Sequence, residues 1–192
     1  MRWVAPLLLL VMRCASAPSP TAETDLQDDG LADYAALGVG RVREYAVRYP
    51  GQQGKLRVET TERREGWFLD DRGARLRLAS DGLRDEDRYL IRRPLVAGTR
   101  WRSVLSASAV EHYEIKSVGQ PCAVPAGRFR DCLVVEARLR RDDSMELEAE
   151  WLWIRGVGLA RIRTVARVQG RRIPQTVQEL VGYDFSPPRG AP

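Results

Sequence analysis

The feature that most constrains the fold is an alternation of apolar and polar residues that runs through most of the chain. In residues 75–78 (RLRL), every second side chain is apolar. Successive side chains of a β-strand point to opposite faces of a sheet, so this period predicts strands buried on one side. Similar runs recur at intervals of about ten residues and end at clusters of Gly, Pro and Asp, as is typical of hairpins. They cover residues 42–49, 56–61, 67–69, 75–78, 89–91, 110–118, 133–139, 147–154, 159–168 and 177–183.

We therefore predict an all-β protein with a single antiparallel meander sheet of about 8–11 strands, curved into a barrel or half-barrel. A charged helix over residues 133–154 is an alternative to two of these strands. The Asp142-Asp143-Ser144 break and the β-branched and aromatic residues at both ends favour a hairpin there.

The first 17 residues are typical of a secretory signal peptide. Arg2 precedes an apolar run at residues 4–12 (VAPLLLLVM), and small residues follow at 14–17. The run is too short to cross a bilayer as a helix, which takes about 20 residues. We therefore predict export to the periplasm or the outer membrane.

Two cleavage sites are open. Cys14 follows the apolar run as the lipid-modified cysteine of a bacterial lipoprotein does, although Arg13 stands where such signals have a small residue. A cut after Ser16 is the alternative, since a cut after Ala17 would leave Pro18 directly behind it. We favour a lipoprotein with its lipid on Cys14, so that a lipid anchor is the only expected contact with the membrane.

The remaining chain has the length of one domain. Residues 18–39 are rich in Pro, Ser, Thr and acidic residues and are expected to form a flexible tether, in which residues 31–37 can form one helical turn. Residues 40–185 form the β-rich domain. The proline-rich residues 186–192 are expected to be a disordered tail.

The three cysteines fit an exported protein. With Cys14 assigned to the lipid, Cys122 and Cys132 remain for a disulfide in an oxidising compartment. Each lies five residues from Gly127, and residues 124–127 (VPAG) favour a turn. We therefore expect a hairpin in which the two cysteines face each other; two buried free thiols are the alternative.

The sequence lacks the usual marks of an active site. His112 is the only histidine, so a zinc site lacks ligands, and we expect this residue to lie partly buried in a strand. No G-x-S-x-G turn is present, and the acidic clusters lack the spacing of a calcium loop. We expect no catalytic residue, no cofactor and no metal, and predict that the protein is not an enzyme; a hydrolase is a distant third interpretation.

The basic charge does not point to a nucleic acid. The formal net charge of +5 falls to +3 when Arg2 and Arg13 leave with the signal peptide. All basic residues except Lys55 and Lys116 are arginines, and they fall mostly on the polar side of the alternating runs. A solvated sheet face explains this spacing, so we predict no nucleic-acid partner.

Four motifs occur in order: residues 98–101 (GTRW), 124–129 (VPAGRF) between the two cysteines, 151–161 (WLWIRGVGLAR) and 179–183 (ELVGY). Together they resemble the TapB-like family of exported bacterial proteins, a domain of unknown function, over residues 40–185. In that family a V-P-A-G-x-F segment precedes a cysteine-bearing strand, and W-x-x-x-G-V-G-L-V follows one hairpin later; Ala160 replaces the usual valine. The resemblance implies a β-rich envelope domain, linked in some members to type IV pilus assembly, and it brings no catalytic residues.

The motif residues are better explained by the fold than by a site. Proline and glycine favour turns, glycine permits tight reversals, and aromatic residues anchor a sheet core. The residues concerned are Trp101, Pro125, Gly127, Phe129, Trp153, Gly156 and Gly158.

We predict a non-enzymatic envelope lipoprotein that acts as a binding or scaffolding module, with a type IV pilus or another surface assembly as candidate partner. The alternative is a periplasmic carrier that holds a lipid or other apolar ligand in a curved sheet. Four tryptophans distinguish the two. If several of them line an open cavity, the carrier is favoured, and if all pack in a filled core, the scaffold is favoured; they are Trp67, Trp101, Trp151 and Trp153.

Overall fold

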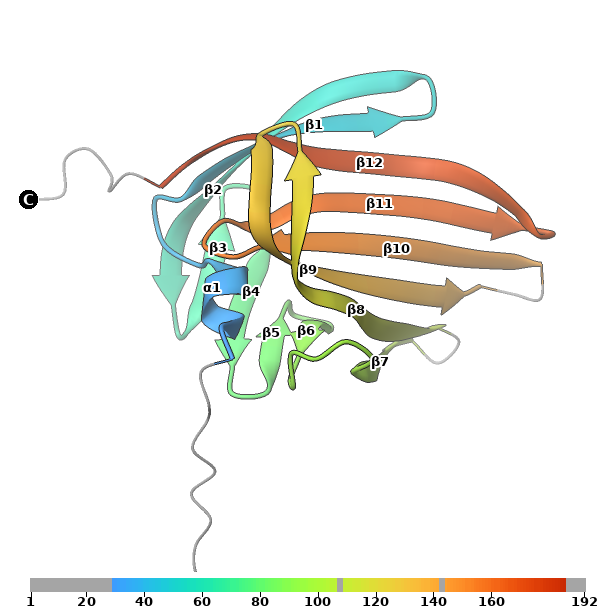
Figure 1. Ribbon diagram of the computed structural model, residues 1–192, viewed down its shortest axis with the longest axis horizontal. Helices are drawn as coiled ribbons and strands as arrows, with labels where there is room; N and C mark the ends of the chain where they lie inside the picture. Colours follow the sequence, from blue (N-terminus) through green and yellow to red (C-terminus); the bar gives the residue numbers. More distant parts are fainter. Residues whose placement is uncertain (1–28, 107–108, 142–143, 186–192) are drawn as a thin grey trace, which may run out of the picture.

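A computed structural model of the chain describes residues 29–106, 109–141 and 144–185. These residues form one sheet of twelve antiparallel strands and a single short helix, α1 (Leu31–Ala35) (Figure 1). The predicted signal peptide with Cys14, most of the predicted tether and the predicted tail lie outside the described residues. The strands are β1 (Val42–Tyr49), β2 (Gln52–Arg64), β3 (Trp67–Asp70), β4 (Arg75–Ala79), β5 (Gly82–Arg84), β6 (Tyr89–Arg92), β7 (Arg100–Ser106), β8 (Ala109–Val124), β9 (Gly127–Arg140), β10 (Met145–Ile154), β11 (Gly158–Val168) and β12 (Arg171–Asp184).

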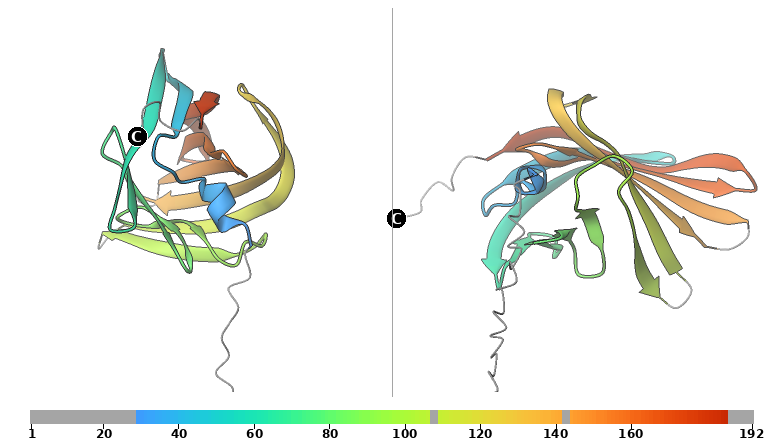
Figure 2. Two further views of the ribbon diagram at one scale, coloured as in Figure 1. Left: turned by 90° about the vertical axis from the view of Figure 1, so that its left-hand side faces the viewer. Right: turned by 60° about the horizontal axis from the view of Figure 1, so that its bottom comes forward.

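The strands form a meander that is joined at its ends. The order in the sheet is β6-β5-β4-β3-β2-β1-β12-β11-β10-β9-β8-β7, so the first and last strands are neighbours and the edges lie in mid-chain. The sheet curves until β6 and β7 approach each other, which gives a nearly closed barrel (Figure 2). The predicted all-β meander is confirmed, as is the hairpin over residues 133–154. The strand count exceeds the predicted range by one, and two strands, β5 and β7, lie outside the ten runs of the sequence pattern.

The inner face of the barrel holds the main core. Ile115 lies opposite Val135, Val135 opposite Trp151, and Trp151 opposite Ile162, so one row of large apolar side chains crosses four strands. Ile115 and Val135 are fully buried. This row is a direct product of the period-two pattern, because each inward position is followed by an outward one.

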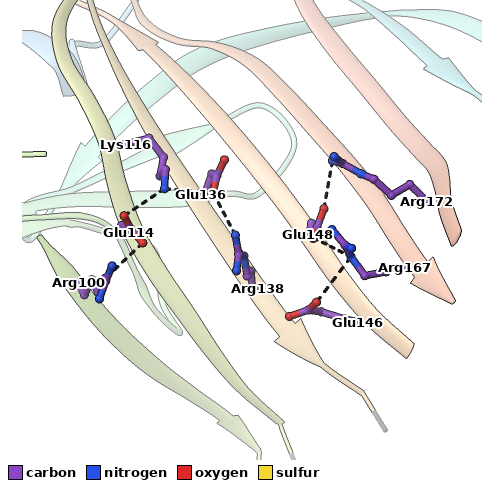
Figure 3. Close-up of polar contacts among 9 residues, drawn as sticks. All are labelled: Arg100, Glu114, Lys116, Glu136, Arg138, Glu146, Glu148, Arg167 and Arg172. Carbon is purple, nitrogen blue, oxygen red and sulfur yellow. Dashed lines mark hydrogen bonds and ion pairs between the residues drawn. The ribbon is translucent and has the colours of Figure 1, made fainter. Parts of the chain in front are cut away.

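The outer face of β7 to β12 carries a lattice of charged side chains (Figure 3). Glu114 pairs with Arg100 at 3.2 Å and with Lys116 at 3.1 Å, and Glu148 pairs with Arg167 at 2.8 Å. Exposed pairs of this kind stabilise a fold only weakly, so the lattice serves mainly to keep this face solvated. His112 lies on this face and is exposed. The expectation that it is partly buried was therefore wrong, since its register places it beside Arg138, facing solvent.

The hairpin formed by the ends of β8 and β9 curls over the outside of the barrel. Its tip reaches β12, where the amide of Ala126 donates to the carbonyl of Leu180 at 3.0 Å. A second apolar cluster fills the space beneath it and includes Val124, Cys132 and Leu152. The hairpin thereby covers apolar side chains that the strong curvature of the sheet would leave in water.

A disulfide joins Cys122 and Cys132 inside this hairpin, with their Cα atoms 6.1 Å apart. The two residues do not face each other as expected. Val124 lies opposite Gly127, so the turn is centred at Pro125-Ala126 and regular pairing places Cys122 opposite Phe129. An irregularity between Gln120 and Cys122 then places Cys132 opposite Gln120. The count failed because it took Gly127 as the centre of the turn and because a bulge shifts pairing without changing the composition of the strand.

The helix α1 lies in one mouth of the barrel (Figure 2). Leu31 and Tyr34 are fully buried there and belong to the main core. The folded domain therefore includes Asp29–Val39, which the sequence had assigned to the tether, because the few apolar residues of this segment suffice to dock one helical turn. Among the described residues, no helix is long and apolar enough to cross a membrane.

Candidate functional site

A cavity of about 290 Å³ lies inside the barrel, between the wall of β2 to β6 and the strands β10 to β12. Most of its lining is apolar and comes from both sides of the barrel. The volume is at the lower end of the range of about 300–1,000 Å³ that is usual for small-molecule sites. Representative lining residues are Val58, Phe68, Leu90, Trp151, Trp153 and Ile162.

The four tryptophans divide between cavity, core and surface. Trp151 and Trp153 line the cavity. Trp101 is buried in an aromatic stack, 5.1 Å from Tyr113, whose ring lies 5.5 Å from that of Trp151. Trp67 is absent from the lining and lies beneath the guanidinium groups of Arg77 and Arg84. Two of the four thus face an open space, which favours the carrier.

A buried charge cluster supports one side of the cavity. Arg88 lines the cavity and pairs with Glu111 at 2.7 Å and with Asp85 at 3.2 Å. The hydroxyl of Tyr113 donates to the same Glu111 carboxylate. Burial, followed by this hydrogen bond, raises the pKa of Tyr113 well above its ordinary value. Burial works against the charge of Arg88, but the bond to Glu111 and its charge outweigh that effect and the pKa of Arg88 is raised. The cluster therefore stays ionised at Arg88 and protonated at Tyr113 at neutral pH.

Arg43 and Tyr45 lie two residues apart on β1, so their side chains are on the same face of the strand, and both line the cavity. Its Nε donates to the carbonyl of Val157 and its Nη2 to the carbonyl of Ala36, both at 2.8 Å. No described carboxylate forms an ion pair with it, and burial lowers the pKa of the Arg43 guanidinium. Tyr45 donates to the carbonyl of Leu159 at 2.8 Å, and burial raises its pKa to about 12.

Two motif glycines shape this end of the cavity. Gly158 has φ 94°, and a Cβ there would lie 2.8 Å from Nη2 of Arg43, so only glycine lets the arginine lie against the β10–β11 turn. Gly156, at φ 75°, donates its amide to the carbonyl of Asp33 and so ties the turn to α1. The predicted reversal of the chain at these glycines is present, and it also seats the cavity arginine.

Trp153 is the motif residue that contributes most directly to the cavity. Its side chain is 2% exposed and lines the cavity. Its Nε1 is buried and has no hydrogen-bond partner among the described residues. A buried N–H donor without an acceptor costs about 1–3 kcal/mol, so an unmet donor at a cavity wall marks a place for an acceptor.

A charged cluster holds α1 in place beside the cavity. Arg155 pairs with Asp131 at 2.6 Å and with Asp33 at 3.2 Å, and its guanidinium lies 5.1 Å from the ring of Tyr34. The hydroxyl of Tyr34 donates to Asp131. Ala35 and Leu37, next to this cluster, belong to the cavity lining. The segment 29–39, which the sequence had assigned to the tether, thus contributes to the cavity wall.

The remaining predicted residues lie elsewhere. Neither cysteine of the disulfide lines the cavity, and Pro125, Gly127 and Phe129 shape the outer hairpin. In the part of the chain that is described, no group of three or more His, Cys, Asp or Glu residues could hold a metal ion.

Sequence reasoning missed Arg43, Arg88 and Glu111. A signal existed for two of them. Arg43 alternates with the inward-facing residues Tyr45 and Val47, so its side chain lies on the same side of β1. Glu111 alternates in the same way with Tyr113 and Ile115 on β8. A charged residue in the apolar phase of a strand is therefore the pattern that would have indicated this site.

The fold has counterparts among solved structures, whereas the sequence matches no family model and no curated protein. A crystal structure from Bacteroides fragilis NCTC 9343, of a protein provisionally described as exported and as having a YmcC-like fold, gives a TM-score of 0.51 at 10% identity, over 77% of this chain and 97% of that one. A second crystal structure, of a protein provisionally described as a lipoprotein from Parabacteroides distasonis ATCC 8503, gives 0.46 at 11% identity, over 79% and 98%. The first likeness shows a shared fold. The resemblance to the TapB-like family stays a prediction, since no family model supports it.

Proposed function

We propose that this chain is an exported, non-enzymatic envelope protein that carries an apolar ligand in the cavity of its barrel. The observation that carries the proposal is the open, mainly apolar space lined by Trp151 and Trp153. Tryptophan side chains offer a large apolar surface that would be costly to keep in contact with water alone. A curved sheet that encloses such a space can shelter a ligand during its passage between membranes.

The proposed location rests on residues 1–17, and the carrier would be held at a membrane by a lipid on Cys14. Its fold counterpart from Bacteroides fragilis is provisionally described as exported, which agrees with this location. Replacing Cys14 by serine is expected to move the protein from the membrane fraction to the soluble periplasmic fraction. Fractionation followed by mass measurement of the N-terminus tests this, and a chain that keeps Met1 in the cytoplasm would contradict export altogether.

Ligand binding is tested with an uncharged fluorescent probe, N-phenyl-1-naphthylamine, whose emission rises in an apolar site. The wild-type mature protein is expected to bind the probe saturably. Val58→Phe should weaken binding at least tenfold, about 1.4 kcal/mol, because the larger ring occupies part of the cavity. Val104→Phe makes the same side-chain change at a site that is 66% exposed and outside the cavity lining, and it should bind as the wild type does. Equal binding by both variants would place the probe outside the cavity and refute the proposal.

A protein-interaction module is the second candidate, and the sheet edge favours it. Among the described strands, β7 pairs with β8 alone, and it exposes Val104 and Leu105, so an extended segment of another protein could add to this edge. A pilus component, which the TapB-like resemblance implies, would be a partner of this kind. Copurification from envelope membranes would name it.

A further inference from the structure

We propose that the ligand is an amphiphile with one anionic, oxygen-bearing group, and that Arg43 and Trp153 bind this group at the α1 end of the cavity. The inference rests on the proposed carrier function and specifies its ligand. Two donor groups at the α1 end of this mainly apolar cavity carry it: a guanidinium without a carboxylate partner and an indole N–H without an acceptor among the described residues.

The first unmatched group is the guanidinium of Arg43. The residue is 8% exposed, and the described part of the chain provides two carbonyls but no carboxylate for it. Those carbonyls engage Nε and Nη2, and the guanidinium carbon lies 5.2 Å from the ring of Phe185, whereas no described residue accepts a hydrogen bond from Nη1. A buried cation without a counter-ion is costly, and an anion that entered the cavity would remove that cost.

The acidic side chains of the cavity are not available to fill this role. Asp70 accepts from the amides of Arg72 and Ala74 at 2.9 and 2.8 Å, which holds it in its own turn. Asp85 accepts from the amide of Arg88 at 2.8 Å and pairs with the guanidinium of that residue. Both carboxylates are therefore satisfied, and Arg88 is neutralised by Glu111 and Asp85. Arg43 remains as the cavity cation without an anion among the described residues.

The second unmatched group is Nε1 of Trp153, which is buried and without an acceptor. Trp153 lies opposite Leu159 beside the β10–β11 turn, and Arg43 reaches the same turn from β1 through its bond to Val157. An oxygen-bearing anion can accept from an indole N–H and a guanidinium together, while its apolar body extends along Val58, Phe68 and Ile162.

The ligand class is tested by comparing cis-parinaric acid with its uncharged methyl ester, by fluorescence titration of the full mature chain. The acid is expected to bind at least tenfold more tightly, because only the acid offers a full charge to Arg43. Arg43→Gln should reduce this preference to about onefold. Arg41→Gln is the matched control: Arg41 also donates to the carbonyl of Ala36, at 3.0 Å, but is absent from the cavity lining, so this variant should keep the preference.

Trp153→Phe retains a six-membered aromatic ring and removes the indole N–H together with the five-membered ring, so it should weaken the acid and the ester alike, by about fivefold. If Arg43→Gln does not fold, the ratio of acid affinity to ester affinity in the wild type still tests the anionic group. The Trp153→Phe titration still tests the contact with Trp153. Displacement of the probe by palmitate or by lysophosphatidic acid, and not by hexadecanol, would support the inference and identify the head group as carboxylate or phosphate.

The outcomes separate the two proposals. If the ester binds as tightly as the acid, or hexadecanol displaces the probe as well as palmitate, the anionic ligand is refuted and the carrier function stands. If inorganic phosphate alone displaces the probe as well as lysophosphatidic acid, the amphiphile is refuted. If neither acid nor ester binds, the carrier function itself fails.

Discussion

Replacing Glu111 by alanine is expected to lower the free energy of unfolding by about 3 kcal/mol, measured by urea denaturation. Glu111 is 7% exposed and holds both Arg88 and the hydroxyl of Tyr113. Its loss leaves a cation and a buried hydroxyl without their acceptor. We place the effect at the lower end of the range for broken buried pairs, because the Arg88 side chain is 30% exposed and water can solvate part of its charge once Glu111 is removed.

Glu114→Ala is the matched control, three residues along the same strand. Glu114 belongs to the outer lattice, where Arg100 and Lys116 are its partners, and its removal should leave the unfolding midpoint nearly unchanged. Glu111→Gln keeps an acceptor for Tyr113 and should fall between the two. If both alanine substitutions changed the stability equally, the inner cluster would contribute no more to stability than the outer ion pairs do.

Removing the disulfide by the double replacement Cys122→Ala and Cys132→Ala is expected to destabilise the protein by about 3 kcal/mol. A bridge over a loop of ten residues restricts the unfolded chain, and its removal releases that restriction. A further loss comes from the packing of Cys132, which is 1% exposed in the second apolar cluster. The measurement is chemical denaturation of the variant beside the oxidised and reduced wild type.

The reduced wild type keeps both sulfur atoms, so it separates the effect of the bridge from the effect of side-chain packing. We expect reduction to cause most of the loss in unfolding free energy that the double variant shows. Peptide mapping of the unreduced mature protein should show residues 122 and 132 in one linked peptide pair. Two free thiols that react with an alkylating agent in protein from the periplasm would contradict the bridge.

The strands could be predicted because their information is local. In β9 and β10 each inward residue, such as Val135 or Trp151, is followed by an outward one, and this period needs no knowledge of distant neighbours. The Cys122–Cys132 bridge could be predicted from the number of cysteines and the export signal, whereas the count from Gly127 gave the wrong register for the two residues. The three-residue strand β5 was missed because it is too short to show a period, and β7 was missed because its apolar residues, Trp101, Val104 and Leu105, do not alternate.

The sequence pattern could have indicated Arg43 and Glu111 as inward-facing charges, but the assembly of the candidate site could not be predicted because it depends on contacts between distant segments. Arg43 meets Val157, which lies 114 residues away, and Glu111 meets Arg88 across the seam of the barrel. The docking of α1 likewise depends on Arg155 and Asp131, which are distant in sequence. The composition of the segment around residue 31 therefore does not predict that it docks. Curvature decides all of these contacts, and curvature arises from bulges and from the summed twist of many strands.

The pairing of β1 with β12 determines when folding can finish. Val42 lies opposite Asp184, so the first strand of the domain receives one of its two neighbours from the end of the chain. Contacts between residues so far apart in sequence close large loops and form slowly. A chain exported from its N-terminus would therefore present an unpaired β1 edge until its last strand has crossed the membrane. During that interval the nascent protein depends on protection from pairing with other chains.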